Sequence, residues 1–358
     1  MVRCIRLGIV RNACLWRASL HACAAQRKAR RVKSRNHTSA RHLPFICNNC
    51  QTKLSTMFSL KGKNAAITGA GGAIGTQIAI SFAEAGASTI LLSDISKEAL
   101  DRLQKLLDSK PSCSATCFLY QVCDVSIDEQ VAELVAKLDE HGGLDIMVNN
   151  AGVFPTDLDG DAVTVTARAW ELTHSINVLG TWLGCKHAIL SMRRFRKQSG
   201  SVINLSSVAG LIGSATSQLA YTASKGAVIA MTRELGIVHA REGFRFNSLC
   251  PGPLDSPMLQ DFLEGEDDSK GSSATVSEPA KGQTSRRLRR EVHLPQGRWG
   301  APLEVAGAAV FLASDASSFV NSTELVVDGG LTKAFVTPEG EPHHSILSKP
   351  RPGTNSNL

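Results

Sequence analysis

From Lys63 to about residue 335, short apolar segments alternate with longer amphipathic ones. The short segments are rich in Val, Ile and Leu and predict strands at 65–68, 89–93, 116–121, 146–149, 202–205, 244–249 and 324–327. The longer segments repeat apolar residues at helical spacing and predict helices at 76–85, 97–107, 128–138, 167–194, 220–240 and 303–313. This strict alternation predicts an α/β protein with a parallel sheet of about seven strands, covered by helices on both faces.

The alternation fits a single doubly wound domain over residues 57–335, because no linker divides it. A basic extension, 1–56, precedes the domain, and a tail rich in Pro, Ser and Asn, 336–358, follows it. One internal segment, 261–291, begins with acids and ends with arginines. Such a charge-segregated stretch is typical of a solvated, mobile loop, and its place within the domain also fits an active-site lid.

Charge is distributed unevenly along the chain. The formal net charge is +7, yet residues 1–56 hold twelve Lys or Arg and no acid, and the remainder holds 27 basic and 32 acidic residues. The folded part therefore gives no electrostatic reason to expect nucleic-acid binding. The head resembles a mitochondrial presequence in composition, whereas Met57, directly before the first strand, is an alternative start. Mitochondrial and cytoplasmic locations both stay open.

The ten cysteines show no disulfide framework. Five lie in the head, and the other five are irregularly spaced and predict reduced thiols in an intracellular protein: Cys113, Cys117, Cys123, Cys185 and Cys250. Cys47 and Cys50 have the spacing of half a zinc or redox site, but no second pair is near, so no metal is expected. No stretch of eighteen apolar residues predicts a membrane span.

A glycine-rich turn connects the first predicted strand to the first predicted helix. Its candidate cofactor contacts are Thr68, Gly69, Gly71, Ala73, Ile74 and Gly75. Glycines let the backbone approach a pyrophosphate, and a helix N-terminus supplies N–H donors and a favourable dipole. A tight turn alone also needs glycine, but the strand–turn–helix context favours dinucleotide binding.

Polar residues end the next strands. Asp94, nineteen residues after Gly75, can accept hydrogen bonds from both ribose hydroxyls of NAD and would repel the 2′-phosphate of NADP. The alternative is that Asp94 caps the following helix, a role that Ser96 can also take. Further cofactor contacts are expected at the ends of the third and fourth strands, where ligands gather in open α/β sheets: Asp124, Val125, Asn150, Ala151 and Gly152.

Tyr221 and Lys225 are four residues apart and share one face of a predicted helix. A lysine beside a tyrosine favours the phenolate and lowers the phenol pKa from about 10 toward neutral pH. The pair could then move a proton to or from an oxygen. The spacing alone equally fits a half-buried aromatic residue with a solvated lysine.

Together these motifs resemble the short-chain dehydrogenase/reductase family over most of residues 57–335. The resemblance rests on 68–75, Asp94, 149–152, Asn177, Ser207, Tyr221 with Lys225, and Pro251 with Gly252. It implies an NAD(P)-dependent oxidoreductase with a seven-stranded, Rossmann-like sheet that forms homodimers or homotetramers.

The resemblance also implies a role for each matched residue. Tyr221 would be the general acid/base at the substrate oxygen, and Lys225 would lower its pKa and hydrogen-bond the nicotinamide ribose. Ser207 would polarise the substrate oxygen, and Asn177 would bind a water in a proton relay. Without the resemblance, Ser207 fits an ordinary strand-end serine and Asn177 a helix-bending amide. Further implied cofactor contacts are Pro251, Gly252 and Ser256.

The chain departs from the family pattern in three places. Ala73 replaces the usual second-position glycine and adds only a methyl group. Ser207 precedes Tyr221 by fourteen residues, one more than in many members, which leaves Ser206 as an alternative and implies a one-residue bulge between them. The charged 261–291 segment lies where the family has its substrate-binding loop.

The sequence therefore predicts hydride transfer between NAD, preferred over NADP, and a small secondary alcohol or ketone. The expected substrate side is mostly apolar, which favours a neutral substrate: Val153, Phe154, Pro155, Ala209, Leu211, Ser214, Leu254 and Met258. A catalytically silent, dinucleotide-binding regulator or scaffold is the alternative, against which the intact tyrosine, lysine, serine and asparagine argue. Nucleotide-sugar epimerases and dehydratases share the fold but carry a larger C-terminal region.

Overall fold

The computed structural model of the protein describes residues 57–213, 217–256 and 293–335. The basic head (1–56), the charged segment (261–291) and the tail (336–358) lie outside these residues. What the sequence predicts for those three segments therefore stays a prediction.

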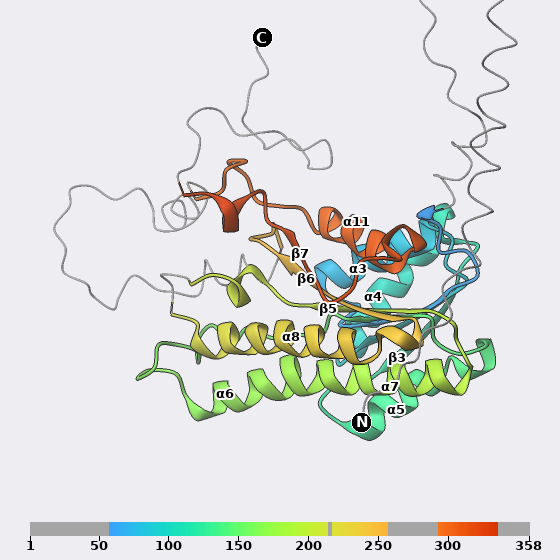
Figure 1. Ribbon diagram of the computed structural model, residues 1–358, viewed down its shortest axis with the longest axis horizontal. Coiled ribbons are helices and arrows are strands. Elements are labelled where there is room, and N and C mark those ends of the chain that lie inside the picture. The colour runs from blue at the N-terminus through green and yellow to red at the C-terminus, as the bar shows by residue number, and fades with distance from the viewer. Residues whose placement is uncertain (1–56, 214–216, 257–292, 336–358) are drawn as a thin grey trace, which may run out of the picture. The chain divides into compact units, whose positions relative to one another are not determined.

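Seven strands form one parallel sheet in the order β3-β2-β1-β4-β5-β6-β7 (Figure 1). Their bounds are β1 Asn64–Thr68, β2 Thr89–Asp94, β3 Cys117–Val122, β4 Ile146–Asn149, β5 Gly200–Leu205, β6 Phe244–Pro251 and β7 Glu324–Val327. Each strand starts and ends within two residues of its predicted place, so the α/β fold class and the sheet predicted from the apolar segments are confirmed.

The α-helices are α3 Ala73–Glu84, α4 Lys97–Asp108, α5 Asp128–Ala136, α6 Ala167–His174, α7 Thr181–Arg194, α8 Leu219–Val238 and α11 Pro302–Ala313. The predicted continuous helix 167–194 is interrupted by a π-helical segment, η3 (Ser175–Gly180). Within this segment the side chain of Asn177 hydrogen-bonds to the backbone of Val153, and such π-helical turns often lie at functional sites. Short 3₁₀ turns lie at Pro111–Cys113, Asp139–His141, Val208–Gly210, Ala240–Glu242, Asp315–Ser317 and Leu331–Lys333.

The strands are apolar on both sides because helices cover both faces of the sheet (Figure 1). In β1, Ala65 and Ile67 pack in a core with α3, α4 and α11. Ala66, between them, packs in a second core with α5 and α7. Each fully buried Leu or Ile in these cores stabilises the fold by about 1.5–3 kcal/mol.

The strand order reverses between β1 and β4, which are neighbours in the sheet. Connections from the carboxyl ends of these two strands leave toward opposite faces and open a crevice at that edge. The glycine turn after β1 and the segment after β4 both lie there. The topology therefore places the predicted cofactor residues at the position where such sheets bind ligands.

All five cysteines of the described part are free thiols, as their spacing predicted. No helix within the described ranges is long and apolar enough to cross a membrane. The same residues contain no group of three or more His, Cys, Asp or Glu side chains that could hold a metal ion.

Candidate active site

The glycine turn is shaped by close packing against the segment after β4. Gly69 has a positive φ of 61°, and a Cβ built on it would lie 2.8 Å from the Cα of Ala151. No larger residue fits this position without moving the backbone. Gly72, the N-cap of α3, provides no side-chain cap, so the first turn of the helix can offer its N–H groups to an anion. These donors fit a pyrophosphate.

Two side chains fix this turn to its neighbours. Asn150 Nδ2 donates to the carbonyls of Thr68 and Gly69, both at 2.9 Å. Thr68 Oγ1 accepts from the backbone N–H groups of Asn150 and Ala151, both at 3.1 Å. Thr68 and Asn150 therefore hold the ends of β1 and β4 together.

Asp94 ends β2 beside the turn. Its Oδ2 accepts from the backbone N–H of Gly71 at 3.0 Å, and its Oδ1 accepts from that of Ser96 at 3.1 Å. The cap of α4 is Ser96, whose Oγ accepts from the N–H of Ala99 at 3.1 Å. The interpretation of Asp94 as the helix cap is therefore wrong, because Ser96 occupies the N-cap position.

A cavity of about 470 Å³ opens between these elements. It brings together most of the predicted cofactor residues: Gly69, Gly71, Ala73, Ile74, Asp94, Asp124, Val125, Asn150, Ala151, Gly152 and Ser256. The other predicted cofactor residues do not line it: Thr68, Gly75, Tyr221, Lys225, Pro251 and Gly252. Gly75 instead packs against the turn, and a Cβ on Gly252 would lie 2.8 Å from the Cα of Asp328 in the segment after β7. The glycine donors and the carboxylate fit a dinucleotide.

The predicted catalytic residues meet at the same edge of the sheet. Ser207 follows β5, and its Oγ accepts from the N–H of Ala209 at 3.1 Å and hydrogen-bonds the Tyr221 side chain. Ser206 Oγ is buried and donates instead to the backbone carbonyl of Lys225 at 2.8 Å. The geometry favours Ser207 over Ser206 as the partner of the phenol. The bulge expected between Ser207 and Tyr221 stays a prediction, because residues 214–216 of that loop lie outside the described residues.

Asn177 is fully buried and joins three elements. Its Oδ1 accepts from Val153 N–H at 2.8 Å, and its Nδ2 donates to the carbonyl of Val153 and to Ser224 Oγ, both at 3.0 Å. A Cβ built on Gly152 would lie 3.2 Å from Asn177 Oδ1 and 3.4 Å from Lys225 Nζ. The segment after β4 thus lies close to both Asn177 and Lys225, and a side chain at Gly152 would pack tightly against Asn177.

Burial dominates the electrostatics of the Tyr221–Lys225 pair. Lys225 is 5% exposed, and its Nζ donates to the carbonyl of Leu205 at 2.9 Å and lies 5.6 Å from the centre of the Tyr221 ring. Loss of solvation lowers the pKa of Lys225 to about 8, opposed by the nearby Cys250 thiol. Loss of solvation also raises the pKa of Tyr221, opposed by the hydrogen bond from Ser207.

The sequence predicted the opposite direction for the phenol, a pKa lowered by Lys225. In the structure, which contains no cofactor, this prediction is wrong. The ammonium points to the Leu205 carbonyl, and burial penalises the phenolate more than the neighbouring groups stabilise it.

Comparison with known proteins agrees with this geometry. The family model of the short chain dehydrogenases matches residues 63–267, and a second model, described as enoyl-(acyl carrier protein) reductase, matches residues 273–332. The chain belongs to the short-chain dehydrogenase/reductase family. It is thus a member of a family of NAD(P)-binding, Rossmann-fold oxidoreductases, as the sequence motifs implied.

Individual relatives of this family cover the same part of the chain. Oxidoreductase UcpA of Salmonella typhimurium is 34% identical over 277 residues, which are 77% of this chain and 97% of the relative. L-fucose dehydrogenase of Bos taurus is 34% identical over 281 residues, 78% of this chain and 93% of the relative. The crystal structure of levodione reductase superposes with a TM-score of 0.69 at 29% identity, covering 77% of this chain and all of that one.

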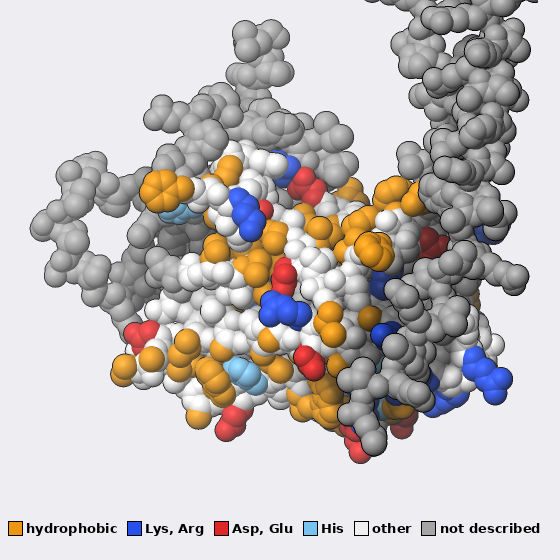
Figure 2. Space-filling view, in the orientation of Figure 1, with side chains coloured by type: hydrophobic (Ala, Val, Ile, Leu, Met, Phe, Trp, Pro, Cys, Tyr) orange, Lys and Arg blue, Asp and Glu red, His pale blue; other side chains and the backbone are white. Residues whose placement is uncertain are grey.

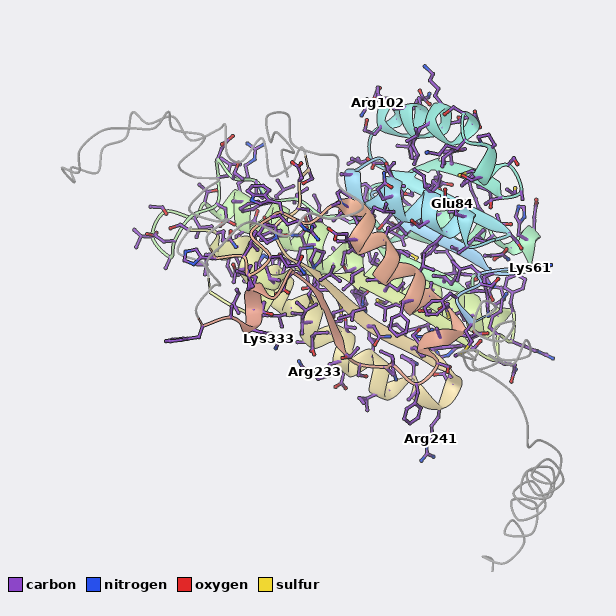
Figure 3. The ribbon with its side chains drawn as sticks, turned by 90° about the horizontal axis from the view of Figure 1, so that it is seen from above. Lys61, Glu84, Arg102, Arg233, Arg241 and Lys333 are labelled. Atoms are coloured by element: carbon purple, nitrogen blue, oxygen red, sulfur yellow. The ribbon has the colours of Figure 1, made fainter. Side chains whose placement is uncertain are left out.

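The structure adds residues near the site that the sequence did not single out. Arg102 of α4 lines the cavity beside Asp94 and makes no hydrogen bond or ion pair within the described ranges (Figure 3). Asp159, in the segment after β4, accepts hydrogen bonds from the first turn of α8, the helix that carries Tyr221. The place of Arg102 in the predicted helix 97–107, directly after the strand that ends at Asp94, could have suggested it. No local pattern points from Asp159 to a helix sixty residues later.

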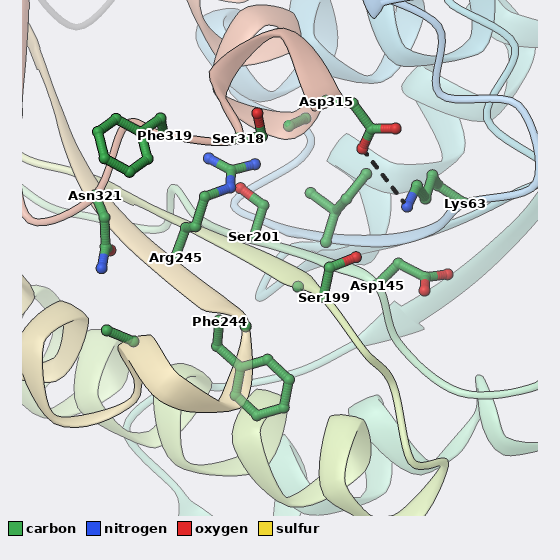
Figure 4. A pocket seen from close by; sticks show the side chains of 15 residues that line it. Lys63, Asp145, Ser199, Ser201, Phe244, Arg245, Asp315, Ser318, Phe319 and Asn321 are labelled. Atoms are coloured by element: carbon green, nitrogen blue, oxygen red, sulfur yellow. Dashed lines mark ion pairs between the residues drawn. The ribbon is translucent and has the colours of Figure 1, made fainter. Parts of the chain in front are cut away.

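A second cavity, of about 410 Å³, lies at the amino ends of the strands, opposite the cofactor edge (Figure 4). Its charged side chains have partners. Lys63 lies 4.0 Å from Asp315, and Arg245 donates to the carbonyls of Leu312 and Ser314 at 2.9 and 3.3 Å. Arg245 thereby satisfies carbonyls at the C-terminus of α11, which gives this cavity a structural explanation.

Burial of Lys225 predicts a pH-dependent stability. Its pKa is about 8 when folded and 10.5 ordinarily, so between these values the unfolded chain binds more protons and stability rises with pH. A shift of this size corresponds to about 3 kcal/mol. We expect the unfolding free energy of the parent, minus that of Lys225→Met, to increase by roughly 2–3 kcal/mol from about pH 7 to about pH 10. Urea unfolding without cofactor measures this difference, and a constant difference would contradict the buried ammonium.

Proposed function

We propose that this short-chain dehydrogenase interconverts a secondary alcohol and a ketone with a nicotinamide dinucleotide. The observation that carries the proposal is the convergence of Tyr221, Ser207 and Lys225 at the sheet edge that also holds the glycine turn and Asp94. The groups suited to proton chemistry and those suited to dinucleotide binding thus lie at the same edge of the sheet.

The proposed roles follow from the geometry of each side chain. Tyr221 donates a proton to the substrate oxygen during reduction and accepts it during oxidation. Ser207, already hydrogen-bonded to the phenol, holds and polarises the same oxygen. The bound cofactor supplies the hydride or accepts it. Lys225 would hold the nicotinamide ribose, and Asn177 supports the proton relay next to Lys225.

We infer NAD as the preferred cofactor, with NADP possible. Asp94 supports this preference, since its carboxylate lines the cavity where an adenosine ribose would lie. Arg102 on the same wall is a cation that a 2′-phosphate could approach, and one solved relative, from Agrobacterium tumefaciens, contains bound NADP.

We infer an apolar substrate side from two of the predicted lining residues, Phe154 and Ala209. The rings of Phe154 and Tyr221 lie 4.6 Å apart, and Ala209 is buried nearby after β5. Ser214 and Met258 lie outside the described residues. A small neutral substrate, or the neutral end of a larger one, suits this lining.

A spectrophotometric screen of secondary alcohols and ketones with NAD(H) and NADP(H) tests the proposal. The panel includes compounds that the names of relatives suggest, namely L-fucose, a 3-oxoacyl thioester and levodione. Turnover above that of a Tyr221→Phe control supports the proposal. Tight NADH binding without turnover of any compound would favour the silent regulator instead.

We also propose self-association into a homodimer or homotetramer. Hydrophobic side chains gather over α6 and α7 (Figure 2), and those with more than a third of their surface exposed are Trp170, Leu172, Leu179, Trp182 and Leu190. Such a patch on a family member is suited to a second copy of the chain. Equilibrium sedimentation gives the mass of the assembly.

The head, residues 1–56, is proposed as a targeting segment or an upstream extension outside the catalytic domain. Since the family match begins at residue 63 and Leu60 is already buried in the core, we expect the 57–358 variant to fold and to bind NADH as the full chain does. Circular dichroism and a binding titration check this. An insoluble 57–358 variant would show that the head belongs to the fold, and imaging of both forms in cells separates mitochondrial from cytoplasmic location.

A further inference from the structure

The N-terminus of α8 is capped by a distant loop. Gln218, the N-cap residue, makes no side-chain cap bond. The backbone N–H of Leu219 donates to the carbonyl of Gly160 at 2.9 Å. Those of Ala220 and Tyr221 donate to Asp159 Oδ1 and Oδ2, each at 2.9 Å. Three N–H groups that a helix leaves without internal partners are thus satisfied by two residues of the 153–166 loop, which connects β4 to α6.

The 153–166 loop holds the carboxylate in place. The N–H of Asp159 donates to the carbonyl of Pro155 at 2.9 Å, and Oδ1 also accepts from the N–H of Gly160 at 2.8 Å. Gly160 is buried, and a Cβ built on it would collide with Thr164 Oγ1. The Asp159 carboxylate is therefore held in place at the N-terminus of α8.

The same loop also contacts the ring of Tyr221. Phe154, near its start, packs on the phenol ring with centres 4.6 Å apart and planes inclined by 38°. The backbone of Tyr221 is held by Asp159 and its ring by Phe154. A carboxylate at a helix N-terminus is further favoured by the helix dipole and makes charge-assisted hydrogen bonds.

We propose that Asp159 is a positioning residue for Tyr221, which sets the orientation of the phenol relative to substrate through the first turn of α8. The proposal rests on the proposed function, in which Tyr221 moves the proton. Asp159 does not touch the reacting atoms itself. Loss of its two hydrogen bonds would let the first turn shift, and a misplacement of about 1 Å can cost about 100-fold in rate.

Three variants test the role of the carboxylate. Asp159→Ala removes both acceptors, whereas Asp159→Asn keeps one carbonyl oxygen for the helix. Asp161→Ala is the matched control, because Asp161 carries the same charge in the same loop but its side chain accepts only from Val163 and Thr164. We expect kcat to fall roughly 10- to 100-fold in Asp159→Ala and to recover partly in Asp159→Asn. Asp161→Ala should stay within about twofold of the parent, and NADH affinity should stay within about twofold in all three.

Hydrogen exchange provides a readout that does not need turnover. We expect the amides of residues 219–221 to exchange faster in Asp159→Ala than in the parent and in Asp161→Ala, with the core strands unchanged. The proposal would be overturned if Asp159→Ala kept the parental kcat, or if exchange at 219–221 were unaltered. It would also be overturned if the loss of kcat were matched by an equal loss of NADH-binding sites. If the parent turns over no substrate, the proposed function fails, and the exchange comparison alone decides whether Asp159 holds Tyr221.

Discussion

Replacing Tyr221 with Phe is expected to lower kcat by about 10²- to 10⁴-fold, the usual contribution of a positioned acid or base. The phenyl ring keeps its packing against Phe154, so the fold and the cofactor cavity should be unchanged. Only the hydroxyl is lost. Steady-state kinetics with any substrate found in the screen, together with an NADH binding titration, measures both effects.

The other tyrosine of the chain gives a matched control. Tyr120 in β3 has a buried hydroxyl without a hydrogen-bond partner among the described residues, and burial raises its pKa to about 12. Tyr120→Phe should therefore retain full turnover. An equal loss in both variants, or parental activity in Tyr221→Phe, would remove Tyr221 from the mechanism.

The control variant also isolates the catalytic phenol. In Tyr120→Phe, Tyr221 is the only tyrosine left, so an ultraviolet titration reports its pKa directly. Burial raises that pKa above its ordinary value of 10 in the chain without cofactor. Ionisation below pH 10 in the cofactor-free variant would contradict the structure.

Replacing Asp94 with Ala is expected to weaken NADH binding by roughly 10- to 100-fold and to narrow the preference for NADH over NADPH. The reason is the loss of charge-assisted hydrogen bonds to the ribose, each worth about 1.5–3 kcal/mol. The turn itself should loosen as well, because Asp94 Oδ2 holds the N–H of Gly71. Fluorescence titration with both cofactors measures the change.

Asp94→Asn separates charge from hydrogen bonding. The amide oxygen can still accept from Gly71, whereas the negative charge that opposes a 2′-phosphate is gone. We expect Asp94→Asn to narrow the preference for NADH over NADPH as Asp94→Ala does. Its loss of NADH affinity should be smaller than that of Asp94→Ala. Equal affinity of the parent for NADH and NADPH would overturn the proposed preference.

The expected lowering of the Tyr221 pKa was wrong because this pKa depends on how far the side chain is removed from solvent. The spacing of Tyr221 and Lys225 placed both on one helix, as the structure has them, but it could not say that Lys225 is buried and Tyr221 partly buried. Burial opposes charge on each group, and the ammonium finds the Leu205 carbonyl instead. The choice between Ser206 and Ser207 also needed the packing of β5 against α8, which turns Ser206 toward the backbone of Lys225.

The sequence by itself determined the order of strands and helices, the family and the identity of nearly all candidate site residues. These depend on periodicity, on glycines at a tight turn and on residues near one another in the chain. The tertiary structure decided that Asn177 sits in a π-helical segment and bonds to Val153, and that Asp159 caps the helix of Tyr221. Contacts and burial of this kind arise between segments far apart in the sequence, and only their packing brings them together.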